Sequence, residues 1–136
     1  MGISFGRLAK TKLGNEAEVL YQQALEKFQK ATEIKPDKHE AFYNWGGYLL
    51  RIADNKTRAQ KLKIYQRSEE LLIRGVQAGS NVYNLACVYA LQNKKGEALK
   101  ALSQALENDE ITKAFVLEDE DWKDFLDDPE FQALLT

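Results

Sequence analysis

KPDKHEAFYNWGGYLL, residues 35–50, marks the junction between two predicted helices. Pro36 cannot continue a helix, and Asp37 can accept hydrogen bonds from the first N–H groups of the next one. The apolar pattern that follows is helical, although it contains two adjacent glycines, Gly46 and Gly47. Each glycine inside a helix costs about 1 kcal/mol, so we expect a packing or binding reason at this point.

Apolar residues at spacings of three and four continue on both sides of this junction. Residues that favour helix dominate the composition, and Pro36 and Pro129 are the only prolines. Short polar breaks between the periodic segments are typical of antiparallel helix hairpins. The sequence therefore predicts an all-α protein, with helices at about 15–34, 38–54, 57–78, 81–92 and 95–107.

Length and composition narrow the class of protein. With 136 residues, of which 44% are apolar, the chain suits one compact domain. No stretch approaches the roughly 18 apolar residues that span a bilayer, and the N-terminus lacks the pattern of a signal peptide, so we expect no membrane insertion. Cys87 is the only cysteine, which excludes an internal disulfide and is compatible with a reducing compartment. The expected location is cytoplasmic.

Charge is distributed unevenly along the chain. Residues 1–106 hold 17 Lys and Arg against 10 Asp and Glu, a net charge of +7, whereas residues 107–136 hold 2 against 11, a net charge of −9. The positive charges form no cluster dense enough to indicate nucleic-acid binding. We therefore expect no nucleic-acid partner.

The chain also contains a degenerate internal repeat. A comparison of the chain with itself at an offset of 44 residues pairs Arg7 with Arg51, Ala9 with Ala53, and Tyr21 with Tyr65. VYNLACVYALQNKKGEALKALSQAL, residues 82–106, places small and apolar residues at the spacing of a known helical hairpin. The same pattern recurs at Phe42, Trp45, Gly46 and Leu49, and at Ala24, Phe28, Ala31 and Pro36. These residues resemble the tetratricopeptide repeat (TPR) family, in an extended-repeat variant with a C-terminal capping segment.

The resemblance implies a short right-handed solenoid of stacked hairpins. It divides the chain into an incomplete first repeat (1–36), an extended second repeat (37–79), a third repeat (80–108) and a capping segment (109–136). Asp128, Pro129 and Glu130 give a strong helix start within the cap. The first repeat is incomplete, whereas the end of the chain resembles natural endings of TPR arrays, so the resemblance leaves open whether the chain is part of a longer protein.

In this family the first helix of each repeat lines a concave groove that holds a partner. By resemblance, the candidate partner-binding residues here are Arg7, Glu40, Tyr43, Asn44, Gly47, Arg51, Tyr83, Asn84 and Cys87. Asparagine can bind a peptide backbone as donor and acceptor, tyrosine offers a flat surface with a polar tip, and arginine can grip a carboxylate. The two asparagines can equally serve hairpin geometry.

The two glycines receive different interpretations. Gly46 occupies the position where the two helices of a hairpin touch, and Ser68 and Gly75 are small residues expected at the same contact. Gly47 faces the groove by resemblance and can open the floor of a pocket there. The alternative is a tolerated glycine in a helix that packing holds in place.

The sequence contains no recognisable catalytic or metal-binding motif. The acidic tail lacks the glycine-centred loop of an EF-hand, and a solvated cap surface explains its charges more simply. His39 has no second histidine and no neighbouring nucleophile, and Cys87 is expected to be a mostly inert thiol. We therefore expect no catalytic residue, no metal and no cofactor.

The expected function of this chain is therefore to bind another protein or a second copy of itself. The first hypothesis is a non-enzymatic adaptor or scaffold that binds a peptide or helix of a partner protein in its groove. The alternative is a self-assembling homo-oligomer that uses the incomplete first repeat and the basic and acidic ends.

Overall fold

The computed structural model of the chain describes residues 23–31 and 39–136. Within these residues the protein is helical and contains no strand, which confirms the predicted all-α class. The chain folds as two compact units, Met1–Ser80 and Asn81–Thr136. The prediction that all 136 residues form one domain stays a prediction.

The predicted helices agree with the described ones to within a few residues. Residues 23–31 are helical, as expected for the helix at 15–34, the rest of which lies outside the described residues. The elements with defined bounds are α3 (His39–Ile52), η1 (Ala53–Asn55), α4 (Arg58–Gln77), α5 (Tyr83–Leu91), α6 (Lys95–Glu107), α7 (Lys113–Glu118), η2 (Glu120–Phe125) and α8 (Pro129–Leu134), where η denotes a 3-10 helix.

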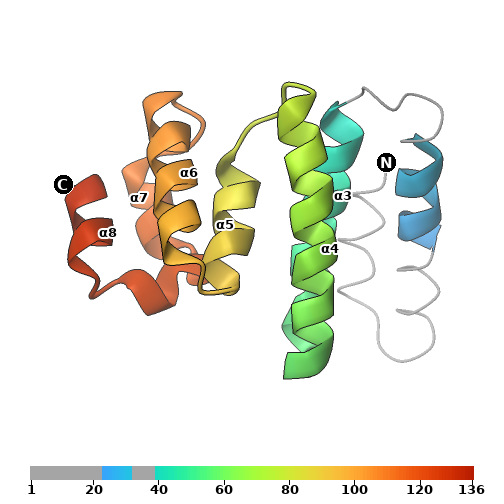
Figure 1. Cartoon of the computed structure of the whole chain (residues 1–136), viewed down its shortest axis with the longest axis horizontal. Coiled ribbons are helices and arrows are strands. Elements are labelled where there is room, and N and C mark those ends of the chain that lie inside the picture. Colours follow the sequence, from blue (N-terminus) through green and yellow to red (C-terminus); the bar gives the residue numbers. More distant parts are fainter. Residues whose placement is uncertain (1–22, 32–38) are drawn as a thin grey trace. The chain divides into compact units, whose positions relative to one another are not determined.

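In the first unit, α3 and α4 form an antiparallel hairpin (Figure 1). Its core contains aromatic and aliphatic side chains from 23–31, α3 and α4: Ala24, Phe28, Phe42, Trp45, Tyr48, Leu49 and Leu71. Thr57 begins α4 with a capping box, because its side chain accepts from the N–H of Gln60 and the Gln60 side chain accepts in return. Gly79, with φ 106°, ends the same helix in a left-handed conformation.

The contact between α3 and α4 explains Gly46. A Cβ atom at this position would lie 2.4 Å from Cγ of Leu72, and the Ser68 hydroxyl donates a hydrogen bond of 2.7 Å to the Gly46 carbonyl. At Gly75, a Cβ atom would lie 3.2 Å from Cβ of Phe42. The expectation that Gly46, Ser68 and Gly75 form the close helix contact is therefore confirmed.

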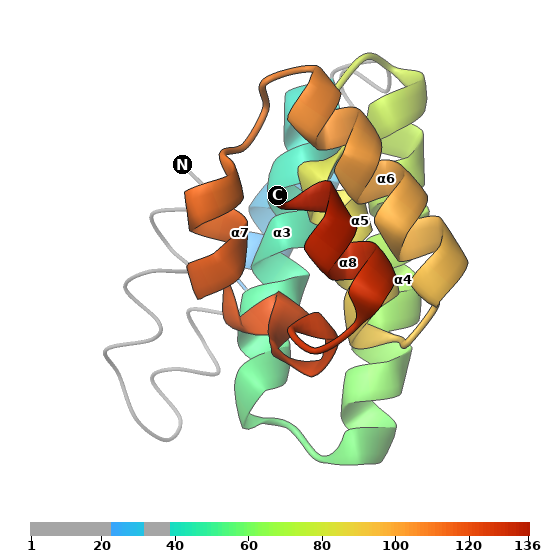
Figure 2. The same cartoon turned by 90° about the vertical axis from the view of Figure 1, so that its left-hand side faces the viewer.

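The second unit contains the α5–α6 hairpin and a C-terminal segment that folds back over it. Figure 2 shows α7, η2 and α8 gathered against this hairpin, and the contacts place η2 on α5 and α8 on α6. Trp122 is fully buried, and its ring lies 5.6 Å from that of Phe131 and 5.7 Å from that of Phe125. The C-terminal segment is thus part of the core of this unit.

Candidate partner-binding face

Four of the nine predicted binding residues lie together on α3. Tyr43, Asn44 and Gly47 are half-buried and Arg51 is exposed. Because a helix turns about 100° per residue, positions 43, 44, 47 and 51 share one side of α3. The other residues of α3 between positions 41 and 50 are all buried. We call these four residues the α3 face.

Gly47 lies between Tyr43 and Arg51 on this face. Tyr43, Gly47 and Arg51 follow one another at intervals of four residues, so they form one row along the helix. Gly47 carries no side chain, so the aromatic and the cationic position of this row are separated by a residue without one.

Arg51 differs from two other arginines of this unit. The Arg67 guanidinium lies 5.1 Å from the centre of the Trp45 ring, and that of Arg74 lies 4.6 Å from the centre of the Phe42 ring. Those two side chains therefore cover aromatic residues of the core. Arg51 makes no ion pair with any residue in the described part of the chain. Its charge is available to an anionic group.

Tyr83 and Cys87 have a different setting from the one expected for groove residues. Their exposed fractions are 6% and 2%, because η2 covers this side of α5. A partner cannot reach either side chain in this arrangement, so we leave both out of the candidate binding face.

Asn84 is half-buried on α5 in the second unit. Arg7 lies outside the described residues, and for Glu40 only the backbone on α3 is described.

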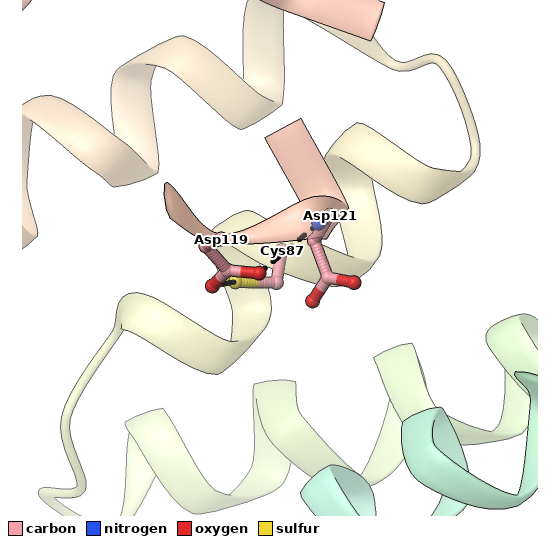
Figure 3. A group of neighbouring side chains, drawn as sticks. All are labelled: Cys87, Asp119 and Asp121. Carbon is pink, nitrogen blue, oxygen red and sulfur yellow. Dashed lines mark hydrogen bonds between the residues drawn. The ribbon is translucent and has the colours of Figure 1, made fainter. Parts of the chain in front are cut away.

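Tyr83 and Cys87 belong to a hydrogen-bonded network, of which Figure 3 shows Cys87 beside Asp119 and Asp121. The Tyr83 hydroxyl donates to Oδ2 of Asp119 over 2.6 Å, and Nε1 of Trp122 donates to the same hydroxyl over 3.1 Å. Sγ of Cys87 lies 4.0 Å from Oδ2 of Asp119. Burial is the largest cause that raises the pKa of both the Tyr83 phenol and the Cys87 thiol. Both groups therefore stay protonated at neutral pH.

Cys87, Asp119 and Asp121 bring three potential metal ligands within 4.8 Å of one another. A thiol binds a metal as the thiolate, and burial together with the two carboxylates disfavours that form. Asp119 also accepts from the Tyr83 hydroxyl and from the backbone N–H of Asp121. These features fit a hydrogen-bonded network better than a cation site.

Other acidic residues of the C-terminal segment also have structural partners. Oε1 of Glu110 accepts from the N–H groups of Val82 and Tyr83, over 2.7 Å and 3.1 Å, and so caps the start of α5. Asp128 caps α8 and pairs with Nζ of Lys95 over 2.7 Å. The hydrogen bond from Lys95 is the largest cause that lowers the pKa of Asp128. Sequence reasoning predicted the cap at Asp128 and missed the one at Glu110.

No protein-family model, no curated protein and no solved structure matches the chain.

The described helices were also examined as membrane spans. None of the helices in residues 23–31 and 39–136 combines the length and the apolar character needed to cross a bilayer. The candidate functional site is the α3 face.

Proposed function

We propose that this chain is a non-enzymatic adaptor that holds a peptide or helix of a partner protein on its α3 face. The proposal includes a TPR-like arrangement, in which the two hairpins are units of a short solenoid. The observation that carries it is the α3 face itself: a row of aromatic, glycine and cationic positions along α3, of which Tyr43 and Gly47 are half-buried and Arg51 is exposed.

The chemistry of this face suits a peptide. Arg51 can pair with a carboxylate of the partner, and Asn44 can bind a peptide group as both donor and acceptor. Tyr43 offers flat apolar area with a polar tip, a combination that is frequent at the energetic centres of interfaces. Gly47, between these groups, adds no side chain that a bound peptide would have to avoid.

The non-enzymatic part of the proposal rests on the chemistry of Cys87. The thiol is 2% exposed, and burial raises its pKa, so it is a poor nucleophile at neutral pH. Its neighbours Tyr83 and Asp119 hydrogen-bond to each other over 2.6 Å. This cluster stabilises the second unit and offers no open position for a substrate.

A display experiment tests the proposal. Random peptides are selected against the wild-type chain, and the affinities of the selected peptides are then measured for Arg51→Glu and for Lys100→Glu. The second variant is a matched control, since it makes the same charge reversal on an exposed position of α6.

We expect Arg51→Glu to weaken binding at least about tenfold, which corresponds to about 1.4 kcal/mol, and Lys100→Glu to leave the affinity within about twofold. Equal affinities of wild type and Arg51→Glu for every selected peptide would exclude the α3 face as the binding surface.

The alternative function is self-assembly of the chain through its oppositely charged ends. Residues 1–80 hold 14 Lys and Arg against 9 Asp and Glu, a net charge of +5, and residues 81–136 hold 5 against 12, a net charge of −7. This difference favours the alternative. The incomplete first repeat that the same hypothesis uses lies mostly outside the described residues.

A further inference from the structure

The start of α4 carries a concentrated positive charge. Lys56, Arg58, Lys61 and Lys63 fall within eight residues, and no acidic residue lies between Asp54 and Glu69. All four are exposed or half-buried, and none forms an ion pair with the residues that the structure describes. Leu62, which is 46% exposed, lies among them. We call these five residues the basic surface.

The end of α7 and the η2 region carry the opposite charge. Glu118, Glu120, Asp124 and Asp127 are exposed, and they have no ion-pair partner in the described part of the chain. Large apolar side chains with high exposure accompany them: Phe115 at 54%, Leu117 at 52% and Leu126 at 42%. We call these seven residues the acidic segment.

These two regions hold every large hydrophobic side chain that is exposed among the described residues. A group of exposed apolar side chains with charges around it, such as Phe115, Leu117 and Leu126, is typical of an interface, where the charges set the partner and the apolar groups contribute affinity. The signs of the two regions are opposite. Each region therefore has the chemistry that would bind the other.

We propose that the basic surface of one molecule binds the acidic segment of a second copy of this chain. The occupant is a second copy because the same chain carries both complementary regions, with net charges of +5 for residues 1–80 and −7 for residues 81–136. The contact joins two different surfaces, so it is head-to-tail, and association continues unless the chain of molecules closes into a ring. It does not depend on the α3 face.

Sedimentation of the full chain gives the first test. At 0.1 M salt the weight-average mass should rise with protein concentration. At 1 M salt the association constant should fall at least about tenfold, because the screening length shortens from about 10 Å to about 3 Å. A monomer mass that stays constant over the whole concentration range at 0.1 M salt would overturn the proposal.

Two variants, each with one region reversed, give a sharper test. Lys61→Glu/Lys63→Glu reverses two of the four charges of the basic surface, and Glu118→Lys/Asp124→Lys reverses two of the four charges of the acidic segment. Each variant alone should be a monomer. Their mixture should associate, because the intact acidic segment of the first variant and the intact basic surface of the second remain complementary, and the two altered regions carry opposite substitutions. Failure of the mixture to associate, with both variants folded by circular dichroism, would contradict a head-to-tail contact.

A matched control separates the local contact from net charge. Lys30→Glu/Lys100→Glu changes the charge of the molecule by the same amount as Lys61→Glu/Lys63→Glu, at exposed positions outside both regions. This control should associate like the wild type. If it weakens association as much as Lys61→Glu/Lys63→Glu, the association follows total charge and the proposed contact is wrong.

Discussion

The contact at Gly46 leads to the most direct prediction on stability. In Gly46→Ala, the new methyl carbon would lie 2.4 Å from Cγ and 2.6 Å from Cδ2 of Leu72. Carbon atoms in contact are normally about 3.5–4.0 Å apart, so Leu72 or the helix backbone must move. Leu72 is 1% exposed, and Ser68 is hydrogen-bonded to the Gly46 carbonyl, so both sides of the contact are held.

Two opposing effects set the magnitude of the change. Overpacking of a well-packed core costs about 1–3 kcal/mol, whereas replacing a helical glycine by alanine gains about 0.5–1 kcal/mol. The steric cost should win here, because the contacts are with buried atoms. We expect Gly46→Ala to lower the free energy of unfolding by about 1–2 kcal/mol.

Urea unfolding followed by circular dichroism measures this loss, and Gly96→Ala is the matched control. A Cβ atom at Gly96 would meet nothing within 4 Å, so that variant should be as stable as the wild type or more stable by up to about 1 kcal/mol. In a Leu72→Ala background the penalty of Gly46→Ala should disappear. If Gly46→Ala is as stable as the wild type, the close approach of α3 and α4 at this point is refuted.

The remaining predictions concern the acidic C-terminal segment. Glu110→Ala should lower the free energy of unfolding by about 1–2 kcal/mol because it removes the cap of α5, whereas Glu110→Gln keeps an acceptor and should retain most of the stability. Tyr83→Phe should lower the free energy of unfolding by about 1–3 kcal/mol, because it leaves the buried N–H of Trp122 without its acceptor. An unchanged urea-unfolding curve would exclude this loss of stability. The pair of Asp128 with Lys95 lowers the pKa of the Asp128 carboxyl in the folded state. The pair therefore contributes its full stabilisation above the ordinary pKa of about 4, and this contribution is lost as the pH falls through the lowered pKa. Asp128→Asn should therefore be less stable than the wild type at neutral pH and equally stable in strong acid, and a difference in stability that does not depend on pH would contradict this assignment.

The helices could be predicted because the information that defines them is local. The helix at 95–107 was predicted with the bounds that α6 has, and the helix at 38–54 corresponds to α3 with η1. Gly46 was also interpretable, since a glycine in a helix with an apolar pattern requires a physical reason and close packing is the usual one. The spacing of apolar residues, the helix caps and the helix breakers thus predict the secondary structure and one tertiary contact, the one at Gly46.

The role of the acidic residues could not be predicted, because their contacts join distant parts of the sequence. Glu110 caps a helix that begins 27 residues earlier, and Asp119 accepts from a tyrosine 36 residues earlier. A run of acidic residues gives no sign of which carboxylates will have such partners. The same segment buries Tyr83 and Cys87, so two residues expected on an open groove lie in the core instead.

The binding of selected peptides to Gly47→Leu tests the central claim, that the α3 face holds the partner. The variant adds a large side chain between Tyr43 and Arg51 on the α3 face without changing charge, and Gly96→Leu is the control at an open position on α6. We expect Gly47→Leu to remain folded and to bind at least about tenfold more weakly, with Gly96→Leu unchanged. If Gly47→Leu binds these peptides as tightly as the wild type, the partner does not lie on the α3 face.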